Sequence, residues 1–322
     1  MTTRRTTNLA SAEATQNRRR LLVSVPTEAL YEAILERADV DVVFWDMTGP
    51  APAPAIDVVV TPYMVGHAVL AQLANVTTRL VQSQLNGYDG VAEMLPAGVT
   101  YANAAGVHET STAELALALI LASQRGIADF VRAAERGHWE RQYLHSLADR
   151  RVLLVGYGGV GRAIEERLLP FETTVVRLAR HERRDERGTV YGFDALGEQL
   201  ALADIVVVGV PLDASTEGLI DDDFLSAMRD GTLLVNIARG KVAHTDALIT
   251  HASTGRLRLA LDVTDPEPLP DGHPLFAMPN VLISPHVGGA TSAMLPRMAR
   301  LLESQIDRLA RGDEPANVVL RT

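Results

Sequence analysis

The sequence has 322 residues, of which 47% are hydrophobic and 22% are charged, with 24 glycines, 16 prolines and no cysteine. This length predicts about two domains, and the apolar fraction is too high for an intrinsically disordered chain. The absence of cysteine excludes disulfides, thiolate nucleophiles and cysteine-ligated metals, and we expect no metal site. The formal charge of −10 argues against nucleic acid as a partner, because phosphate binding needs a basic surface. Apolar runs are shorter than the roughly 18 residues that cross a bilayer, so we expect a cytoplasmic protein without a membrane partner.

Residues 1–20 are rich in threonine and arginine, a composition that organellar transit peptides share. The segment also contains Glu13 and has no clean amphipathic stripe. Polar, arginine-rich termini usually stay solvated, so we expect a disordered tail rather than a targeting signal.

The N-terminal part of the sequence alternates between strand-like and helical patterns. A hydroxyl at Ser111 lies one turn before the carboxylate of Glu114, which predicts a capping box and then a buried apolar helix to about Arg125. A helix is also predicted over 27–37. Short apolar runs predict strands at 21–25, 41–45, 57–61 and 78–83.

A second α/β block begins at Arg151. A helix is predicted over 162–168, and an amphipathic helix over 292–311 starts late, because Pro296 is tolerated only near a first turn. Strands that alternate with helices indicate two doubly wound parallel-sheet domains of the α/β class. The predicted strands are nearly continuous apolar runs, as is required of parallel strands that are covered on both faces. They lie at 152–155, 174–178, 204–208, 232–235, 257–262 and 281–284.

The sequence GYGGVG at 156–161 follows a predicted strand and opens a predicted helix. In this setting it is a dinucleotide-binding fingerprint. Gly156 allows the tight turn, Gly158 lets the backbone approach a pyrophosphate, and Gly161 lets the helix pack on the strand. Gly159 and Val160 lie at the helix N-terminus, whose free N–H groups favour phosphate. The alternative is a glycine-rich turn without a ligand.

The strand at 174–178 would carry a terminal acidic residue if it bound the ribose of NAD. It ends instead at Ala179 and Arg180, with Arg183 nearby. Guanidinium groups bind phosphate bidentately, and no carboxylate at the strand end repels a 2′-phosphate. The sequence therefore favours NADP(H), with Arg180 as the first phosphate-binding candidate and Arg183 as the second. NAD(H) stays open, because acidic residues in the same loop neutralise much of its positive charge.

Three motifs lie at or just after the ends of predicted strands. They are VNIARG at 235–240, LDVTDPEP at 261–268 and SPHVGG at 284–289. In open α/β sheets ligands bind beyond the carboxyl ends of the strands. An arginine, an acid and a histidine are therefore expected to meet in one crevice.

Together with the glycine fingerprint, these motifs resemble the D-isomer-specific 2-hydroxyacid dehydrogenase family over about residues 78–319. The run DVTDPEPLP at 262–270, with Asn86 and Gly87 upstream, is most similar to the glyoxylate/hydroxypyruvate reductases. The resemblance implies a homodimer, with Trp139 or Tyr143 as the aromatic that reaches a neighbouring subunit. It also implies a Rossmann-like dinucleotide-binding domain of residues 106–289, inserted into a flavodoxin-like substrate domain of residues 1–105 and 290–322.

The same resemblance implies the reduction of a small 2-keto acid to a D-2-hydroxy acid. Arg239 would bind the carboxylate and polarise the ketone, and His286 would donate the proton, since histidine titrates near neutral pH. Glu267 would orient the imidazole, although Asp265 is a second candidate for this acid. Each residue also has a purely structural interpretation. Arg239 would form an ion pair, His286 would be an ordinary loop residue, and Glu267 would be part of a turn.

Further contacts follow from the resemblance. Asp262 would bond the nicotinamide carboxamide. Backbone N–H groups at Asn86 and Gly87 would meet the substrate carboxylate, because glycine permits close approach. The remaining expected cofactor contacts are Val210, Pro211, Thr216, Ile237, Ala238 and Gly288.

Two other functions stay open. A D-3-phosphoglycerate dehydrogenase would need a cationic pocket for the substrate phosphate, whereas 41–100 contains only His67 and Arg79 as basic residues. Such an enzyme often carries a C-terminal regulatory domain, which we do not expect here. A non-catalytic dinucleotide sensor would share the fold, but it would not need the arginine, glutamate and histidine of a proton relay.

Overall fold

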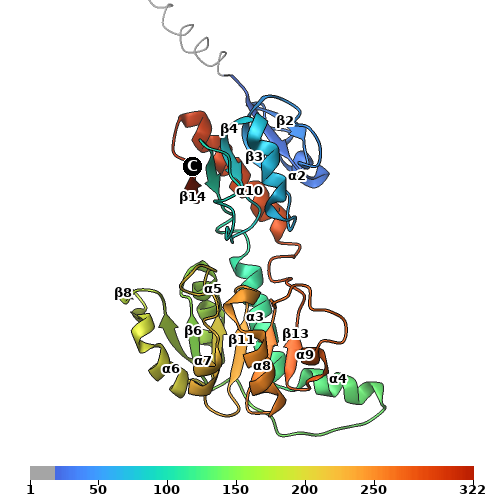
Figure 1. The fold of residues 1–322 in the computed structure, drawn as a ribbon, viewed down its shortest axis with the longest axis vertical. Helices are drawn as coiled ribbons and strands as arrows, with labels where there is room; N and C mark the ends of the chain where they lie inside the picture. The colour runs from blue at the N-terminus through green and yellow to red at the C-terminus, as the bar shows by residue number, and fades with distance from the viewer. Residues whose placement is uncertain (1–18) are drawn as a thin grey trace, which may run out of the picture. The chain divides into compact units, whose positions relative to one another are not determined.

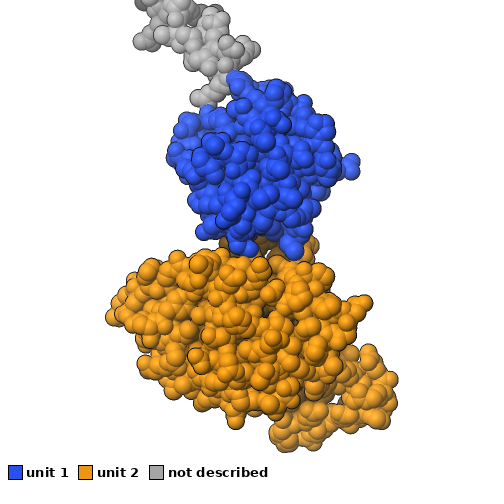
Figure 2. All heavy atoms as spheres, in the orientation of Figure 1, with its two compact units in different colours: residues 1–104, 295–322 blue, residues 105–294 orange. Residues whose placement is uncertain are grey.

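Parallel strands dominate both parts of the structure, a computed structural model that describes residues 19–322. The chain divides into one unit that ends at residue 104 and resumes at 295–322, and a second unit of residues 105–294 (Figure 2). The expectation of a disordered tail at 1–20 falls outside the described residues, apart from Arg19 and Arg20. No helix within 19–322 has the length and apolarity needed to cross a membrane.

The described part of the first unit forms a six-stranded sheet in the order β14-β5-β4-β3-β1-β2 (Figure 1). Neighbouring strands are parallel, except that β14 runs antiparallel to β5. The order 2-1-3-4-5 of the first five strands is the flavodoxin-like order. The strands are β1 (Leu21–Val25), β2 (Val40–Phe44), β3 (Ala55–Val60), β4 (Thr77–Gln82), β5 (Thr100–Ala102) and β14 (Val318–Arg321).

The helices of this unit are α2 (Glu28–Ile34), the 3₁₀ helix η1 (His67–Asn75) and α10 (Met294–Arg311). Helix α10 contains Pro296 in its first turn, as the sequence required. Its buried Gln305 donates to the Gln82 side chain at the end of β4 over 2.7 Å and to the Ala316 carbonyl over 2.9 Å. The C-terminal helix is therefore joined to strands formed by the N-terminal part of the chain.

The second unit, described throughout, has an eight-stranded sheet in the order β13-β12-β11-β10-β6-β7-β9-β8. Only β8 and β9 pair antiparallel. In chain order the parallel strands read 3-2-1-4-5-6-7, which is the Rossmann order with one strand added. The strands are β6 (Arg151–Val155), β7 (Thr174–Leu178), β8 (Arg183–Asp185), β9 (Gly188–Tyr191), β10 (Ile205–Val208), β11 (Leu233–Asn236), β12 (Arg258–Leu261) and β13 (Val281–Ile283). The predicted fold class is confirmed for both units.

Alternate residues of the central strands pack on opposite faces of this sheet. Leu153 and Val155 join one buried cluster, whereas Val152 and Leu154 join another. Residues of α6, α7 and α8 complete the first cluster, and residues of α3 and α5 complete the second. Helices cover both faces, which explains the nearly continuous apolar strands. The helices are α3 (Glu109–Gln124), α4 (Ile127–Glu135), α5 (Gly159–Leu168), α6 (Leu196–Leu202), α7 (Asp222–Ala227), α8 (Thr245–Ser253) and α9 (Pro274–Ala277), with 3₁₀ turns η2 (Leu169–Phe171), η3 (Phe193–Ala195) and η4 (Gly240–Val242).

The predicted capping box at Ser111 is wrong. Helix α3 already begins at Glu109, with His108 as its N-cap residue, so Ser111 lies inside the first turn. The Ser111 hydroxyl is instead hydrogen-bonded to the Thr291 hydroxyl at 2.8 Å, and Glu114 is exposed. The hydroxyl that the local pattern assigned to the helix N-terminus therefore bonds to Thr291, 180 residues further along the sequence.

The loop expected over 180–187 is also different, because β8 and β9 form an antiparallel hairpin there. Its strands are short and rich in arginine and acidic residues, so no apolar alternation marks them. The hairpin extends the sheet beyond β7, to which β9 pairs in parallel.

Gly161 lets α5 approach the turn that follows β6. A Cβ atom at Gly161 would lie 2.5 Å from the carbonyl oxygen of Gly156, whereas a Cβ at Gly197 in α6 would meet nothing within 4 Å. We expect Gly161→Ala to lower the free energy of unfolding by about 1–3 kcal/mol, because backbone must move to admit the methyl group. Urea denaturation followed by circular dichroism measures this.

Gly197→Ala is the matched control. Its methyl group has room in the first turn of α6, so we expect unchanged stability or a gain of up to about 1 kcal/mol. Equal destabilisation by both substitutions would contradict the close helix–strand packing at Gly161.

Candidate active site

The glycine loop lies at the point where the strand order of the second unit reverses, between β6 and β10. Gly156 has φ +103°, and a Cβ there would lie 2.7 Å from the Gly209 carbonyl group that follows β10. A Cβ at Gly158 would meet nothing within 4 Å, and no side chain caps the N-terminus of α5. An open glycine backbone leading into an uncapped helix N-terminus fits a dinucleotide pyrophosphate. Gly159 and Val160 form the first turn of that helix.

Both predicted phosphate-binding arginines lie near this loop, in different settings. Arg180 contacts the Asp213 carboxylate and donates to Ser215 Oγ at 3.2 Å. Hydrogen bonds from Ser215 and the Arg180 guanidinium lower the pKa of Asp213 to about 2. Arg183 donates instead to the Tyr157 carbonyl at 2.8 Å. Arg180 is therefore held in an ion pair, whereas Arg183 is held by the glycine loop itself.

The turn after β10 contains three predicted cofactor contacts. Val210 is buried and Pro211 is exposed. The buried Thr216 hydroxyl accepts from the Asp213 backbone N–H at 2.9 Å and donates to the Pro211 carbonyl at 2.6 Å. Thr216 thereby closes a turn that lies beside the glycine loop.

Arg239 follows β11, after the buried residues Ile237 and Ala238. Its Nη1 atom donates to the Ala238 carbonyl at 2.7 Å. A Cβ at the next residue, Gly240, would lie 1.8 Å from the Thr264 carbonyl oxygen. This contact brings the end of β11 against the loop that contains Glu267.

His286 and Glu267 are in direct contact, with 2.6 Å between Nδ1 and Oε1. An ionised carboxylate only accepts hydrogen bonds, so Nδ1 donates and the other ring nitrogen, Nε2, is left for a reacting group. Asp265, the second candidate for the acid, is exposed, and within residues 19–322 its carboxylate makes no hydrogen bond to His286. The geometry therefore favours Glu267 over Asp265 as the partner of the histidine.

Asp262 holds the loop in which His286 lies. Its carboxylate is 3% exposed and accepts from Ser284 Oγ at 2.6 Å, from the Val287 N–H at 3.0 Å and from the Gly288 N–H at 2.9 Å. Its carbonyl accepts from the His286 N–H at 2.7 Å. Asp262 was predicted to bond the nicotinamide, and Ser284 was not predicted as a site residue. The signal for Ser284 was a hydroxyl at the end of the strand next to that of Asp262.

Asn86 and Gly87 belong to the first unit, where they follow β4. The Asn86 carbonyl accepts from Asn103 Nδ2 at 2.9 Å. The Asn86 Oδ1 atom is buried and has no hydrogen-bond partner within residues 19–322. Their contact with a substrate stays a prediction, as do the other site roles.

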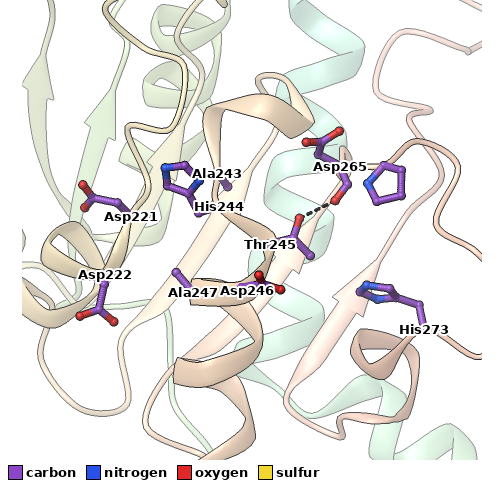
Figure 3. A pocket seen from close by; sticks show the side chains of 10 residues that line it. Asp221, Asp222, Ala243, His244, Thr245, Asp246, Ala247, Asp265 and His273 are labelled. Atoms are coloured by element: carbon purple, nitrogen blue, oxygen red, sulfur yellow. Dashed lines mark hydrogen bonds between the residues drawn. The ribbon is translucent and has the colours of Figure 1, made fainter.

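A hollow of about 660 Å³ lies on the second unit beside α7 and α8 (Figure 3). Four of its residues are aspartates, which would repel an anionic substrate. Two of these carboxylates stabilise the fold: Asp221 caps α7 through the Phe224 N–H, and Asp222 pairs with His251 at 2.8 Å. Across 19–322, no group of three or more histidine and acidic side chains could hold a metal ion. We therefore do not assign the hollow to the reaction.

Asp262→Asn should lower the free energy of unfolding by about 1–3 kcal/mol, because the amide keeps only one acceptor oxygen and its NH2 group faces a donor on the other side. Urea denaturation measures the change. Asp265→Asn, an exposed carboxylate three residues on, is the control and should change stability by less than about 0.5 kcal/mol. Similar small losses in both variants would contradict the role of Asp262 in holding the His286 loop.

Comparison with known proteins identifies the family. Residues 117–288, just over half of the chain, match the family described as "D-isomer specific 2-hydroxyacid dehydrogenase, NAD binding domain". The chain is 30% identical to a human "Glyoxylate reductase/hydroxypyruvate reductase" over 87% of this chain and 91% of that protein. It is 32% identical to a "Glyoxylate reductase" of Pyrococcus furiosus, over 75% of each chain.

A solved structure supports the same relationship. The D-isomer specific 2-hydroxyacid dehydrogenase of Xanthobacter autotrophicus, in complex with NADPH and MES, is 28% identical and superposes with a TM-score of 0.79 over 94% of this chain and 98% of that one. The chain belongs to the D-isomer specific 2-hydroxyacid dehydrogenase family, and it is an NAD(P)-dependent oxidoreductase that interconverts a 2-keto acid and a D-2-hydroxy acid.

Proposed function

We propose that this enzyme reduces glyoxylate or hydroxypyruvate with NADPH. The observation that supports this most directly is the His286–Glu267 pair, at 2.6 Å, on the same sheet edge as Arg239. The similarity to proteins named glyoxylate reductase and hydroxypyruvate reductase supports the substrate class. We also propose that residues 105–294 bind the dinucleotide and that Asn86 and Gly87 contribute to substrate binding.

The proposed chemistry uses few groups of the chain. When bound, NADPH supplies a hydride to the carbonyl carbon of the keto acid. Arg239 binds the substrate carboxylate and draws charge from the ketone. His286 donates a proton from Nε2 to the developing alkoxide, which becomes the hydroxyl group. Glu267, at Nδ1, fixes the ring orientation and stabilises the imidazolium before that transfer.

The choice of NADPH rests on charge. Strand β7 ends at Leu178 without a carboxylate, and Arg180 and Arg183 lie within hydrogen-bond reach of the β10 turn and the glycine loop. The related Xanthobacter protein was solved with NADPH. An arginine at this position matches a 2′-phosphate better than a ribose hydroxyl.

The phosphoglycerate alternative is weaker. Arg79, the one arginine in 41–100, lies 4.0 Å from the Asp57 carboxylate and donates to the Leu309 carbonyl at 3.4 Å. Because Arg79 already contacts an acid and a carbonyl of α10, it has few donors left to bind a substrate phosphate. A sensor would have no use for the His286–Glu267 contact.

Oxidation of NADPH and of NADH with hydroxypyruvate and with glyoxylate, followed by absorbance, tests the proposal. We expect faster turnover with NADPH. His286→Ala should lower kcat by about 10²–10⁴-fold, because the proton donor is lost, and should leave the Kd for NADPH unchanged. Glu267→Gln should also lower kcat, whereas Asp265→Asn should not.

Each result bears on a separate part of the proposal. A preference for NADH would contradict the phosphate-binding role of the arginines and leave the reaction class standing. Unchanged turnover in His286→Ala would contradict the mechanism. Failure of both keto acids with both cofactors would contradict the substrate class.

We also propose a homodimer. Trp139 and Tyr143 are 98% and 95% exposed, and Ile127 and Val131 are exposed on α4. Large exposed aromatics beside exposed apolar residues are typical of an interface. A second copy of the chain is the occupant that the family resemblance favours.

Sedimentation equilibrium should give twice the chain mass of 34.8 kDa. Trp139→Ser should raise the dimer Kd at least about tenfold, as loss of a buried tryptophan anchor does. Phe44→Ser, an exposed aromatic on β2, is the control and should leave the mass unchanged. A monomer at all concentrations would contradict the homodimer.

A further inference from the structure

Tyr157, the second residue of the glycine fingerprint, lies at the centre of a cluster of arginines. Its side chain is buried, and the guanidinium carbons of Arg162, Arg177 and Arg183 lie 6.0, 5.6 and 5.9 Å from its ring centroid. Arginine over an aromatic face is attracted by the ring quadrupole. This ring takes no part in the proposed reaction.

A buried carboxylate balances the cluster. The Glu165 side chain on α5 is 4% exposed, lies 3.1 Å from Arg177 Nε and 2.9 Å from Arg187 Nη1, and accepts from the Tyr157 hydroxyl. Burial and the hydrogen bond to Glu165 raise the pKa of Tyr157. A buried carboxylate that pairs with two guanidiniums and one phenol holds these partners in one arrangement.

The same arginines fasten the β8–β9 hairpin to the rest of the unit. Arg177 on β7 contacts the Asp185 carboxylate at 3.1 Å and donates to the Arg187 carbonyl. Arg187 also pairs with Glu166 on α5 at 2.7 Å. The hairpin is therefore joined through charged groups to β7 and to α5, the helix that follows the glycine loop.

Arg183 lies on β8 of this hairpin. It donates to the Tyr157 carbonyl at 2.8 Å and is exposed, and no carboxylate of residues 19–322 lies within ion-pair distance of it. Arg180, in contrast, is paired with Asp213. A guanidinium has five N–H donors, so one bond to a carbonyl leaves most of them for an anion.

We propose that Glu165 and Tyr157 are positioning residues that hold Arg183 in place for the 2′-phosphate of NADPH. This inference rests on the proposed preference for NADPH. The network fixes the hairpin and the ring under Arg183 before the cofactor arrives, so little side-chain freedom is lost on binding. A purely structural network would support the glycine loop, which NADPH and NADH share, and would affect both cofactors equally.

The test is the Kd of NADPH and of NADH, from quenching of protein fluorescence, first for the wild type and then for variants. Tyr157→Phe and Glu165→Gln should raise the Kd for NADPH on the order of tenfold, which corresponds to the loss of one charge-assisted hydrogen bond. The Kd for NADH should stay within about twofold of the wild-type value. Glu166→Gln is the matched control: its ion pair with Arg187 is exposed and therefore weak, and the buried Glu165 still holds Arg187, so the variant should change neither constant.

A combined variant separates positioning from a direct effect. In an Arg183→Ala background, Tyr157→Phe should cause no further loss of NADPH affinity, because residues that act through one group are not additive. Glu165→Gln leaves Arg177 and Arg187 without their buried carboxylate. If the Glu165→Gln variant does not fold, the measurements on Tyr157→Phe decide the test.

Equal loss of both cofactors, loss of neither, or additive effects with Arg183→Ala would each overturn the inference. Equal affinity of the wild type for NADPH and NADH would show, before any variant is measured, that the cofactor preference itself fails, and the inference would fall with it.

Discussion

The buried carboxylate of Asp262 organises the edge of the sheet where the proposed chemistry takes place. It lies at the end of β12 and accepts hydrogen bonds from a side chain and two backbone N–H groups of the segment after β13. These bonds hold His286 in a left-handed backbone conformation, at φ 51°, that non-glycine residues rarely adopt. A buried acid costs free energy unless its lone pairs are satisfied, and here the loop satisfies them. The acid and the loop therefore stabilise each other, and the histidine is placed as a consequence.

Parallel strands explain why so many distant residues meet at this edge. Their carboxyl ends all reach the same side of the sheet, so the segments after β6, β10, β11, β12 and β13 are neighbours in space. Close backbone approaches show how tightly they meet: Gly156 lies against Gly209, and Gly240 lies against Thr264. Glycine at these positions is a packing requirement, because a Cβ would meet backbone atoms that cannot rotate away. The Glu267–His286 contact joins two of the same segments through side chains.

The sequence predicted the strands well because their buried faces leave a strong local pattern. The intervals 21–25 and 174–178 coincide with β1 and β7, and the other long strands lie within about two residues of their predictions. Elements defined by tertiary partners were missed. Strand β14 forms by pairing with β5, and the β8–β9 hairpin is fixed by arginines that bind acids elsewhere in the fold. The choice between Asp265 and Glu267 likewise depended on a contact across 19 residues of sequence.

The net charge of the chain says little about the charge around that hairpin. A chain with a formal charge of −10 can still place several arginines around one loop, because recognition depends on the local field rather than on the sum. The sequence left open that acidic residues near Arg180 and Arg183 neutralise a solvated segment, as the alternative to phosphate binding. In the structure Asp185 and Glu165 pair with Arg177, and Glu165 also pairs with Arg187, while Arg183 keeps its donors for other partners. Acids of this kind do not cancel the cationic site. They pair with Arg177 and Arg187 and leave Arg183 for the proposed contact with a phosphate.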